Sequence, residues 1–269
     1  MVDIISSAQN PKIKLLLELQ QKSQERRRQG LFVVEGRREI ERCIQSGYQV
    51  DTLFWCPEIF GIEEPTVDGA RVFQVSADIY NKVAYRGGTE GVIAEVVAQQ
   101  RTLDSLKLQK RPLIVVLESV EKPGNVGAIL RSADAANVDA VIVCDPLTDL
   151  YNPNLIRASI GGVFSVPTAV CDSKACITFL KERGVRILTA QLQDSYEYYD
   201  YDMRRATAIV MGTESTGLTD QWREAADAHI RIPMLGRLDS LNVSVSAAIL
   251  MYEAVRQRNS KYQTFNSIM

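Results

Sequence analysis

The stretch PLIVVLESVEKPGNVGAILRSADA, residues 112–135, indicates the fold class of the second half of this 269-residue chain. It opens on a continuous apolar run of strand length, passes a Pro-Gly turn and continues with apolar residues at helical spacing. Strand-length apolar runs recur further on, mostly with helical stretches between them: DAVIVCD (139–145), VRILTAQ (185–191), TAIVMG (207–212) and HIRIP (229–233). Continuous apolar strands spaced by helices are typical of a parallel sheet covered on both faces. We therefore expect an α/β domain with a parallel sheet.

The first hundred residues predict a second, smaller α/β module. A helix is expected over residues 10–29, with Asn10 as its N-cap and a proline in the first helical position. Strands are expected at LFVVE (31–35), VDTLFWC (50–56), RVFQVS (71–76) and GVIAEVV (91–97). Residues 98–112 lose the apolar pattern and are interpreted as a linker. The expected domains are therefore residues 1–108 and 109–269.

The composition excludes several classes of protein. Hydrophobic residues make up 46% of the chain, yet no apolar run reaches the roughly 18 residues that cross a bilayer. The start MVDIISSAQNPKIK lacks the apolar core of a signal peptide, so a cytoplasmic location without membrane partners is expected.

The cysteine and histidine content argues against a metal centre and against most histidine-dependent catalysis. The five cysteines are odd in number, and no two have C-x-x-C spacing, so neither a disulfide framework nor a zinc site is indicated. The single histidine, His229, precedes an apolar residue in a strand-like run and is interpreted as structural.

Positive charge gathers near the N-terminus, although the net charge is only −2. Residues 1–30 hold six basic and three acidic side chains, and further arginines follow. Such a cluster contacts nucleic-acid phosphates in some proteins and is a solvated helix face in others. The candidates for phosphate contact are Arg26, Arg27, Arg28, Arg37 and Arg38.

Three polar loops follow the apolar runs of the second half, where ligands of parallel α/β sheets bind. The first, EKPGNVGAILRSADA (121–135), offers Asn125 as a helix cap and Arg131 further along the same helix. The second, MGTESTGLTD (211–220), resembles a phosphate loop but has Leu218 where the lysine should stand, and Glu214 would repel phosphate.

The third loop, IPMLGRLDSLNVSVSAAILMYEAV (232–255), leads from a proline-bounded turn into a long apolar helix. Ser240 or Asn242 would serve as its N-cap. Each of the three loops alone is explained about as well by capping and turns as by ligand binding. No G-x-G-x-x-G follows any strand, which argues against a dinucleotide fold.

Together and in order, the three loops resemble the SpoU/TrmH family of RNA ribose 2′-O-methyltransferases. The family's N-x-G-A-x-x-R-x-A is similar to residues 125–133, its G-x-E-x-x-G-L to residues 212–218, and its I-P-M and S-L-N-V-S to residues 232–234 and 240–244. FVVEGRREIERCI (32–44) and GGTEGVIAEV (87–96) resemble, more loosely, the family's substrate-binding domain, a small α/β module similar to ribosomal protein L30e.

The resemblance implies a trefoil knot in the second domain, homodimers formed through the knotted region, and S-adenosylmethionine as the cofactor. By position in the motifs, Gly212, Ile232 and Leu241 would hold the adenosine part of the cofactor. The weaker candidates for cofactor binding are Leu188, Thr189, Ala190 and Ser240. The catalytic residues would be Arg131, Glu214, Asn242, Ser240 and Asn125. No metal is required.

The family's proposed catalytic residue, Arg131, is a base in one account. A guanidinium accepts no hydrogen bonds and stays protonated, so a phosphate clamp is physically easier to defend. Glu214 is the alternative base, or a residue that orients Arg131. The RNA partner is expected to be ribosomal RNA gripped by the first domain.

Other functions stay open at this stage. They are a tRNA 2′-O-methyltransferase of the same family, a base methyltransferase with a related knot, and a ribosome-associated RNA-binding protein without catalysis.

Overall fold

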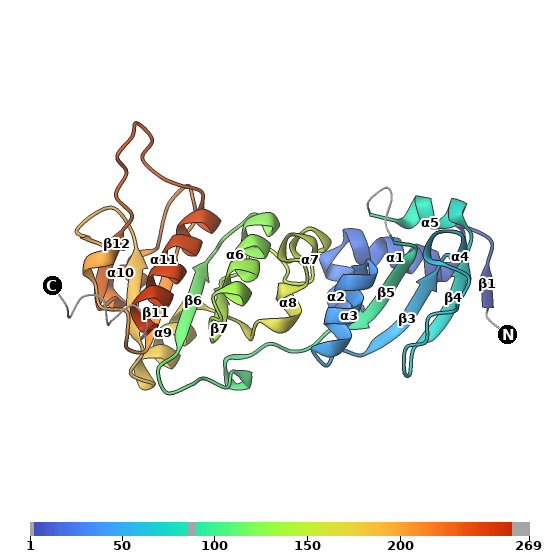
Figure 1. The fold of residues 1–269 in the computed structure, drawn as a ribbon, viewed down its shortest axis with the longest axis horizontal. Coiled ribbons are helices and arrows are strands. Elements are labelled where there is room, and N and C mark those ends of the chain that lie inside the picture. Colours follow the sequence, from blue (N-terminus) through green and yellow to red (C-terminus); the bar gives the residue numbers. More distant parts are fainter. Residues whose placement is uncertain (1–2, 86–89, 260–269) are drawn as a thin grey trace. The chain divides into compact units, whose positions relative to one another are not determined.

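The computed structural model describes residues 3–85 and 90–259 and contains two compact units (Figure 1). The first unit is Met1–Gln100 together with Asp149–Ser165. The second is Arg101–Thr148 together with the chain from Val166 onward. The segment 149–165 thus packs with the first unit although it lies within the second half of the sequence, a return that no feature of the residue pattern indicated.

The first unit is built on a five-stranded mixed sheet with the order β1-β4-β3-β5-β2. Strands β1, β4 and β3 run parallel, whereas β5 is antiparallel to both β3 and β2. The strands are β1 (Asp3–Ile5), β2 (Leu31–Glu35), β3 (Val50–Trp55), β4 (Arg71–Val75) and β5 (Val92–Val97). The helices of this part are α1 (Pro11–Gln21), α2 (Ser23–Gln29), α3 (Arg37–Gln45), α4 (Pro57–Phe60) and α5 (Ala77–Val83). All four predicted strands are confirmed, and β1 was not predicted.

The helix expected over residues 10–29 is two helices. Asn10 is confirmed as the N-cap, since its side chain accepts a hydrogen bond from the Lys12 amide over 2.9 Å. The chain becomes extended at Lys22, where α1 ends and α2 begins. The kink lets α1 bury Ile13, Leu16 and Leu19, while α2 turns Arg26 inward.

Segment 149–165, with α7 (Pro153–Ser159) and α8 (Gly162–Ser165), completes the core of the first unit. The Tyr151 ring stacks on Phe32, with ring centroids 4.1 Å apart. Arg26 is only 4% exposed; its Nε donates to Asp149 Oδ2 over 2.6 Å, and its Nη1 donates to the Leu19 carbonyl. Arg26 therefore holds this segment in place and does not lie on an exposed basic surface, which corrects the expectation that it grips RNA.

The second unit contains the predicted parallel sheet, which is confirmed. Its seven strands have the order β10-β12-β9-β11-β6-β7-β8 and all run parallel. They are β6 (Leu113–Glu118), β7 (Ala140–Cys144), β8 (Thr168–Cys171), β9 (Arg186–Ala190), β10 (Tyr196–Glu197), β11 (Thr207–Met211) and β12 (Ala228–Arg231). The longer helices are α6 (Pro123–Ala135), α9 (Ser173–Glu182), α10 (Asp220–Ala225) and α11 (Val243–Arg258). Strands β8 and β10, both short, were not predicted.

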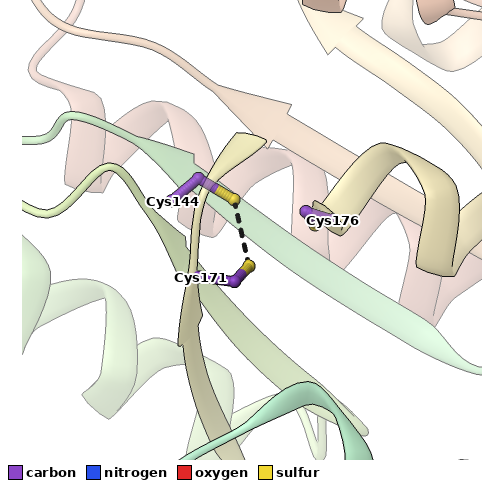
Figure 2. Close-up of side chains that lie close together, drawn as sticks. All are labelled: Cys144, Cys171 and Cys176. Atoms are coloured by element: carbon purple, nitrogen blue, oxygen red, sulfur yellow. Dashed lines mark hydrogen bonds between the residues drawn. The ribbon is translucent and has the colours of Figure 1, made fainter. Parts of the chain in front are cut away.

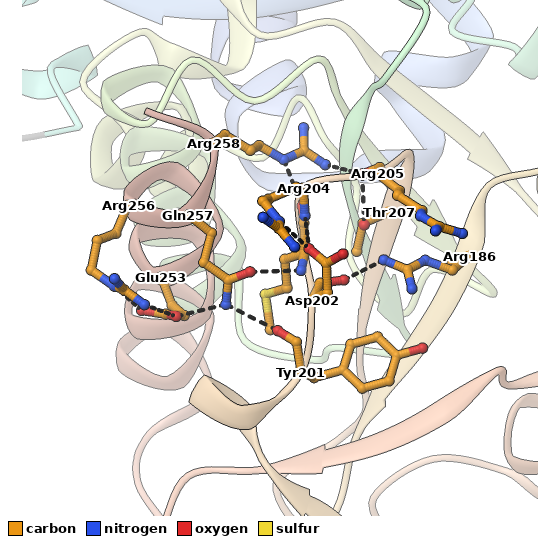
Figure 3. A network of polar contacts seen from close by, with 11 residues as sticks. Arg186, Tyr201, Asp202, Arg204, Arg205, Thr207, Glu253, Arg256, Gln257 and Arg258 are labelled. Carbon is orange, nitrogen blue, oxygen red and sulfur yellow. Dashed lines mark hydrogen bonds and ion pairs between the residues drawn. The ribbon is translucent and has the colours of Figure 1, made fainter. Parts of the chain in front are cut away.

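The C-terminal end of α11 is fixed by a polar network (Figure 3). Arg258 donates hydrogen bonds to the carbonyl oxygens of Met203, Arg205, Arg111 and Pro112. Gln257 donates to the Tyr201 carbonyl over 2.9 Å. These contacts join the C-terminal end of the helix to the start of β6 and to the loop before β11.

None of the helices in the described part of the chain combines the length and apolar character needed to cross a bilayer.

Candidate functional site

The loops that follow β6 and β11 meet the segment that leads into α11, because β6 and β11 are neighbours in a parallel sheet and both end at the same edge. Thr213 and Gly217 pair their backbone groups and close the G-T-E-S-T-G segment into a tight loop. A Cβ added at Gly212 would lie 2.4 Å from the Gly217 carbonyl carbon, so this turn requires glycine there. The loop presents Glu214 at its tip.

Glu214 is the centre of the polar cluster formed by these loops. Its Oε2 accepts from Lys122 Nζ over 3.0 Å. Its Oε1 accepts from Asn125 Nδ2 over 3.1 Å and from Asn242 Nδ2 over 2.9 Å. The backbone amide of Val243 is a further donor at 3.4 Å. The hydrogen bond from Lys122 is the largest of the causes that lower the pKa of Glu214, so the carboxylate is held ionised and is a weak proton acceptor.

Asn242 is both the N-cap of α11 and a member of the cluster. Its Oδ1 accepts from the Ser244 amide over 3.0 Å and from the Ser244 hydroxyl over 2.6 Å. Its Nδ2 donates to Asn125 Oδ1 and to Glu214. The capping hydrogen bonds fix the orientation of the Asn242 amide group. Capping of α11 by Oδ1 and donation by Nδ2 to Asn125 and Glu214 therefore depend on one another.

Asn125 is not the cap of α6, contrary to expectation. The helix begins at Pro123 after Lys122, which places Asn125 in its first turn. The Asn125 amide is therefore free to join Glu214 and Asn242. It donates one N–H and accepts one hydrogen bond there, so its contacts with the residues that the structure describes leave one N–H and one oxygen lone pair available.

A cleft of about 360 Å³ opens beside the cluster, at the carboxyl ends of β9, β11 and β12. Gly212, Ile232, Ser240 and Leu241 line it, as expected for a cofactor site. Leu188 does not. It pairs with Ile209 and Ala228 inside the sheet and is 0% exposed, because it lies two residues before the end of β9. Ala190, at the strand end, lines the cleft in its place.

The cleft holds one buried acceptor that the described residues leave unsatisfied, the side-chain oxygen Oε1 of Gln191. Its Nε2 donates to the Gln193 carbonyl, which turns the oxygen the other way. Glu214 and Asp239 add negative charge to the lining, and Arg223 and Arg231 add positive charge. An unsatisfied acceptor beside side chains of both charges fits a ligand that carries cationic groups, a carboxylate and N–H and O–H donors, as S-adenosylmethionine does.

Arg131 stands apart from this cluster. Its side chain is exposed on α6, and among the described residues no hydrogen bond or ion pair connects it to another side chain. Glu214, expected as one possible orienter of Arg131, is instead engaged with Lys122, Asn125 and Asn242.

The sequence interpretation missed Lys122, Gln191 and Ser244. Lys122 directly precedes Pro123 and Gly124, which were expected to form a turn and instead open α6. A lysine at such a helix start is ordinarily solvated, so only its distance to Glu214 identifies it. His229, interpreted as structural, contacts Thr189 Oγ1 through Nδ1 over 2.6 Å, between two strands of the sheet.

A parallel α/β sheet with a cleft and a carboxylate–amide cluster at the carboxyl ends of its strands defines the chain as an α/β protein with a ligand site in the usual place. The model of the SpoU rRNA Methylase family matches residues 112–252, and that of the MRM3-like substrate binding domain matches residues 10–94. The chain belongs to the SpoU rRNA methylase family. It is an S-adenosylmethionine-dependent RNA ribose 2′-O-methyltransferase.

Relatives of known function match across both units. The chain is 29% identical to the 23S rRNA (guanosine(2553)-2′-O)-methyltransferase RlmP of Bacillus subtilis, over 92% of this chain and 97% of the relative. It is 37% identical to the 23S rRNA (guanosine-2′-O-)-methyltransferase RlmB of Bordetella pertussis, over 73% and 82% respectively. The crystal structure of an AdoMet-bound rRNA methyltransferase from Sinorhizobium meliloti superposes with a TM-score of 0.88 at 28% identity, covering 96% of this chain and 99% of that one.

Proposed function

We propose that the substrate is 23S rRNA, and that the first unit binds this RNA while the second transfers the methyl group. The observation that carries the catalytic assignment is the Glu214-centred cluster, which joins three separate loops beside a ligand cleft. The rRNA substrate is supported by the substrate-binding match over the first unit and by relatives that act on 23S rRNA. A cytoplasmic location follows from that substrate.

Each residue of the cluster has a distinct part in this proposal. The cofactor, when bound, supplies an electrophilic methyl group. Asn125 alone among the cluster's amides keeps hydrogen-bonding capacity, so its free lone pair and N–H orient the ribose 2′-hydroxyl. Asn242 and Glu214 hold Asn125 in that orientation, and Ser240 lies at the cleft wall.

Arg131 is proposed as a phosphate clamp for the target nucleotide. A guanidinium that no described carboxylate engages is available for bidentate binding of a phosphate. Gly212, Ile232, Leu241 and Ser240, with Ala190 and Gln191, are proposed to hold the cofactor.

The RNA-binding surface is proposed to include four exposed arginines of the first unit: Arg27, Arg28, Arg37 and Arg38. Arg28 pairs with Glu25, while the Arg37 guanidinium lies over the Phe60 ring, 4.2 Å from its centroid. The resemblance of this unit to ribosomal protein L30e remains part of the proposal. It rests on residues 32–44 and 87–96, and residues 87–89 of the second segment lie outside the described residues.

We further propose a trefoil knot and a homodimer formed through it. The knot is compatible with the strand order β12-β9-β11-β6. The dimer is supported by large apolar side chains exposed in the loop before α11, since Leu235 is 97% and Leu238 is 74% exposed. Light scattering of the purified chain tests the dimer.

The decisive experiment is transfer of labelled methyl groups from S-adenosylmethionine to separated 23S rRNA, 16S rRNA and tRNA that lack modifications. Nucleoside mass spectrometry then identifies the product. We expect one 2′-O-methyl nucleoside, in the 23S pool. A product found in tRNA alone would contradict the substrate assignment, and a base-methylated product would contradict the role given to Asn125.

A further inference from the structure

Three of the five cysteines lie together in the second unit, on elements that do not line the cofactor cleft (Figure 2). They are Cys144 at the end of β7, Cys171 at the end of β8 and Cys176 in α9. The Cys144 and Cys171 sulfurs are 3.9 Å apart, and all three sulfurs lie within 4.8 Å of one another. Twenty-six residues or more separate Cys144 from the other two in the sequence, so spacing alone could not reveal the group.

The topology explains why the sulfurs converge. Cys144 and Cys171 are register partners in adjacent parallel strands, so both side chains leave the sheet on the same face. Helix α9 follows β8 immediately and covers that face, with Asp172 as its N-cap. The cap places Cys176 in the first turns of the helix, over the two strand ends.

The spacing of the sulfurs matches that of ligands around a single metal ion. A metal–sulfur bond is about 2.3 Å long, so three thiolates around one ion lie about 4 Å apart. The observed triangle needs only small side-chain rotations to reach that geometry. Cys144 and Cys176 are 0% exposed, whereas Cys171 is half-buried and gives a route for the ion from solvent.

No other protein ligand belongs to this group within the described residues. The two neighbouring carboxylates are already engaged: Asp172 Oδ1 accepts from the Ala175 amide over 2.7 Å, and Asp145 Oδ2 accepts from the Ser173 hydroxyl over 2.5 Å. A set of three sulfurs without nitrogen or oxygen ligands selects a soft ion, and a buried set without a fourth ligand suits Cu(I) better than tetrahedral zinc.

We propose that Cys144, Cys171 and Cys176 form a trithiolate site for Cu(I). Binding replaces the proton of each coordinating thiol by a bond to the metal, so up to three protons are released and no oxidation state changes. The site is separate from methyl transfer and follows from the fold of the second unit, whatever RNA the enzyme modifies.

The test is an anaerobic titration of the full-length reduced protein with Cu(I), competed by a chromophoric Cu(I) chelator. We expect one equivalent per chain and a thiolate-to-metal charge-transfer band in the ultraviolet. Cys176→Ala and Cys171→Ala should each weaken binding by more than about tenfold. Cys43→Ala, which removes an equally buried thiol from the first unit, should leave the affinity for Cu(I) unchanged.

A second measurement needs no variant. In the wild-type protein, bound Cu(I) should protect Cys171 from iodoacetamide, as detected by peptide mass spectrometry. The proposal is overturned by absence of the band in protein whose thiols are all reduced, by a Cys144–Cys171 disulfide in protein isolated under anaerobic conditions, or by preferred binding of Zn(II) to the same three cysteines.

Discussion

At the scale of single residues, the hydrogen bonds of Glu214 determine what its carboxylate can do in this site. A carboxylate beside a bound methyl donor is readily interpreted as a general base. Here both of its oxygens accept hydrogen bonds, and Lys122 lowers its pKa. A weakened base with engaged lone pairs serves better to orient Asn125 and Asn242 than to take a proton.

Glu214→Gln should lower kcat for methyl transfer without changing the shape of its pH profile between about pH 6 and about pH 9. Because the pKa of Glu214 is lowered in the folded enzyme, the group is ionised throughout that range. Its contribution to stability is present above the unfolded pKa and is lost as the pH falls through the folded pKa. Single-turnover rates across the pH range check this, and loss of an acidic limb in the variant would identify Glu214 as the base.

Arg131→Ala should abolish methyl transfer while most of the affinity for S-adenosylmethionine remains. The guanidinium lines neither the cofactor cleft nor the Glu214 cluster, so the cofactor does not depend on it. Isothermal titration with the cofactor and methyl-transfer assays measure the two effects separately. Arg131→Lys keeps the charge but not the planar fork, and should recover only part of the activity. Loss of cofactor binding in Arg131→Ala would contradict the clamp assignment.

At the scale of elements, α11 links stability to catalysis. Its first turn carries Asn242 into the cluster, and its last turn is fixed by Arg258. The helix is therefore held at both ends by polar contacts with other elements.

Asn242→Asp and Asn242→Ala should separate capping from catalysis. Aspartate caps helices as well as asparagine does, so Asn242→Asp should keep most of the stability of α11 yet lose methyl transfer, because a second carboxylate would face Glu214. Asn242→Ala should lose both the cap and methyl transfer, and the loss of the cap should lower the free energy of unfolding by about 1 kcal/mol. Thermal denaturation measures the stability of each variant, and methyl-transfer assays measure its activity. An active Asn242→Asp enzyme would show that the amide donor is dispensable.

Arg258→Ala should lower the free energy of unfolding by about 2–3 kcal/mol, because backbone carbonyls of two segments, residues 111–112 and 203–205, lose a charged donor. Arg256→Ala is the matched control. Arg256 is 53% exposed and pairs only with Glu253 within the same helix in the described contacts, so its loss should cost no more than about 0.5 kcal/mol. Urea denaturation compares the two variants, and equal stabilities would contradict the anchoring role of Arg258.

At the scale of the whole molecule, the two units should contribute independently to cofactor and RNA binding. The double variant Arg37→Ala/Arg38→Ala should weaken RNA binding and reduce the slope of log affinity against log salt by about 1–2, since each phosphate contact releases counterions. Cofactor affinity should not change. Lys174→Ala, an exposed lysine of the second unit, is the control. An unchanged salt dependence in the double variant would remove these arginines from the RNA surface.

The sequence by itself determined the α/β class, the parallel sheet of the second unit and three loops whose order identifies the family. These features are local, because apolar runs and turn residues express their preferences over a few neighbours. Asn10 as a cap belongs to the same group.

Only the tertiary structure decided which distant side chains meet. In the folded chain Arg26 is buried against Asp149, and Lys122 pairs with Glu214. Leu188 lies inside the sheet and not in the cleft. The three sulfurs that lie together are those of Cys144, Cys171 and Cys176. Each of these depends on strand order or on the return of segment 149–165, and so on contacts between residues far apart in the chain. Residue type and spacing do not predict such contacts between distant residues. The contacts form only when the whole sheet has formed, because the free energy of packing then favours them.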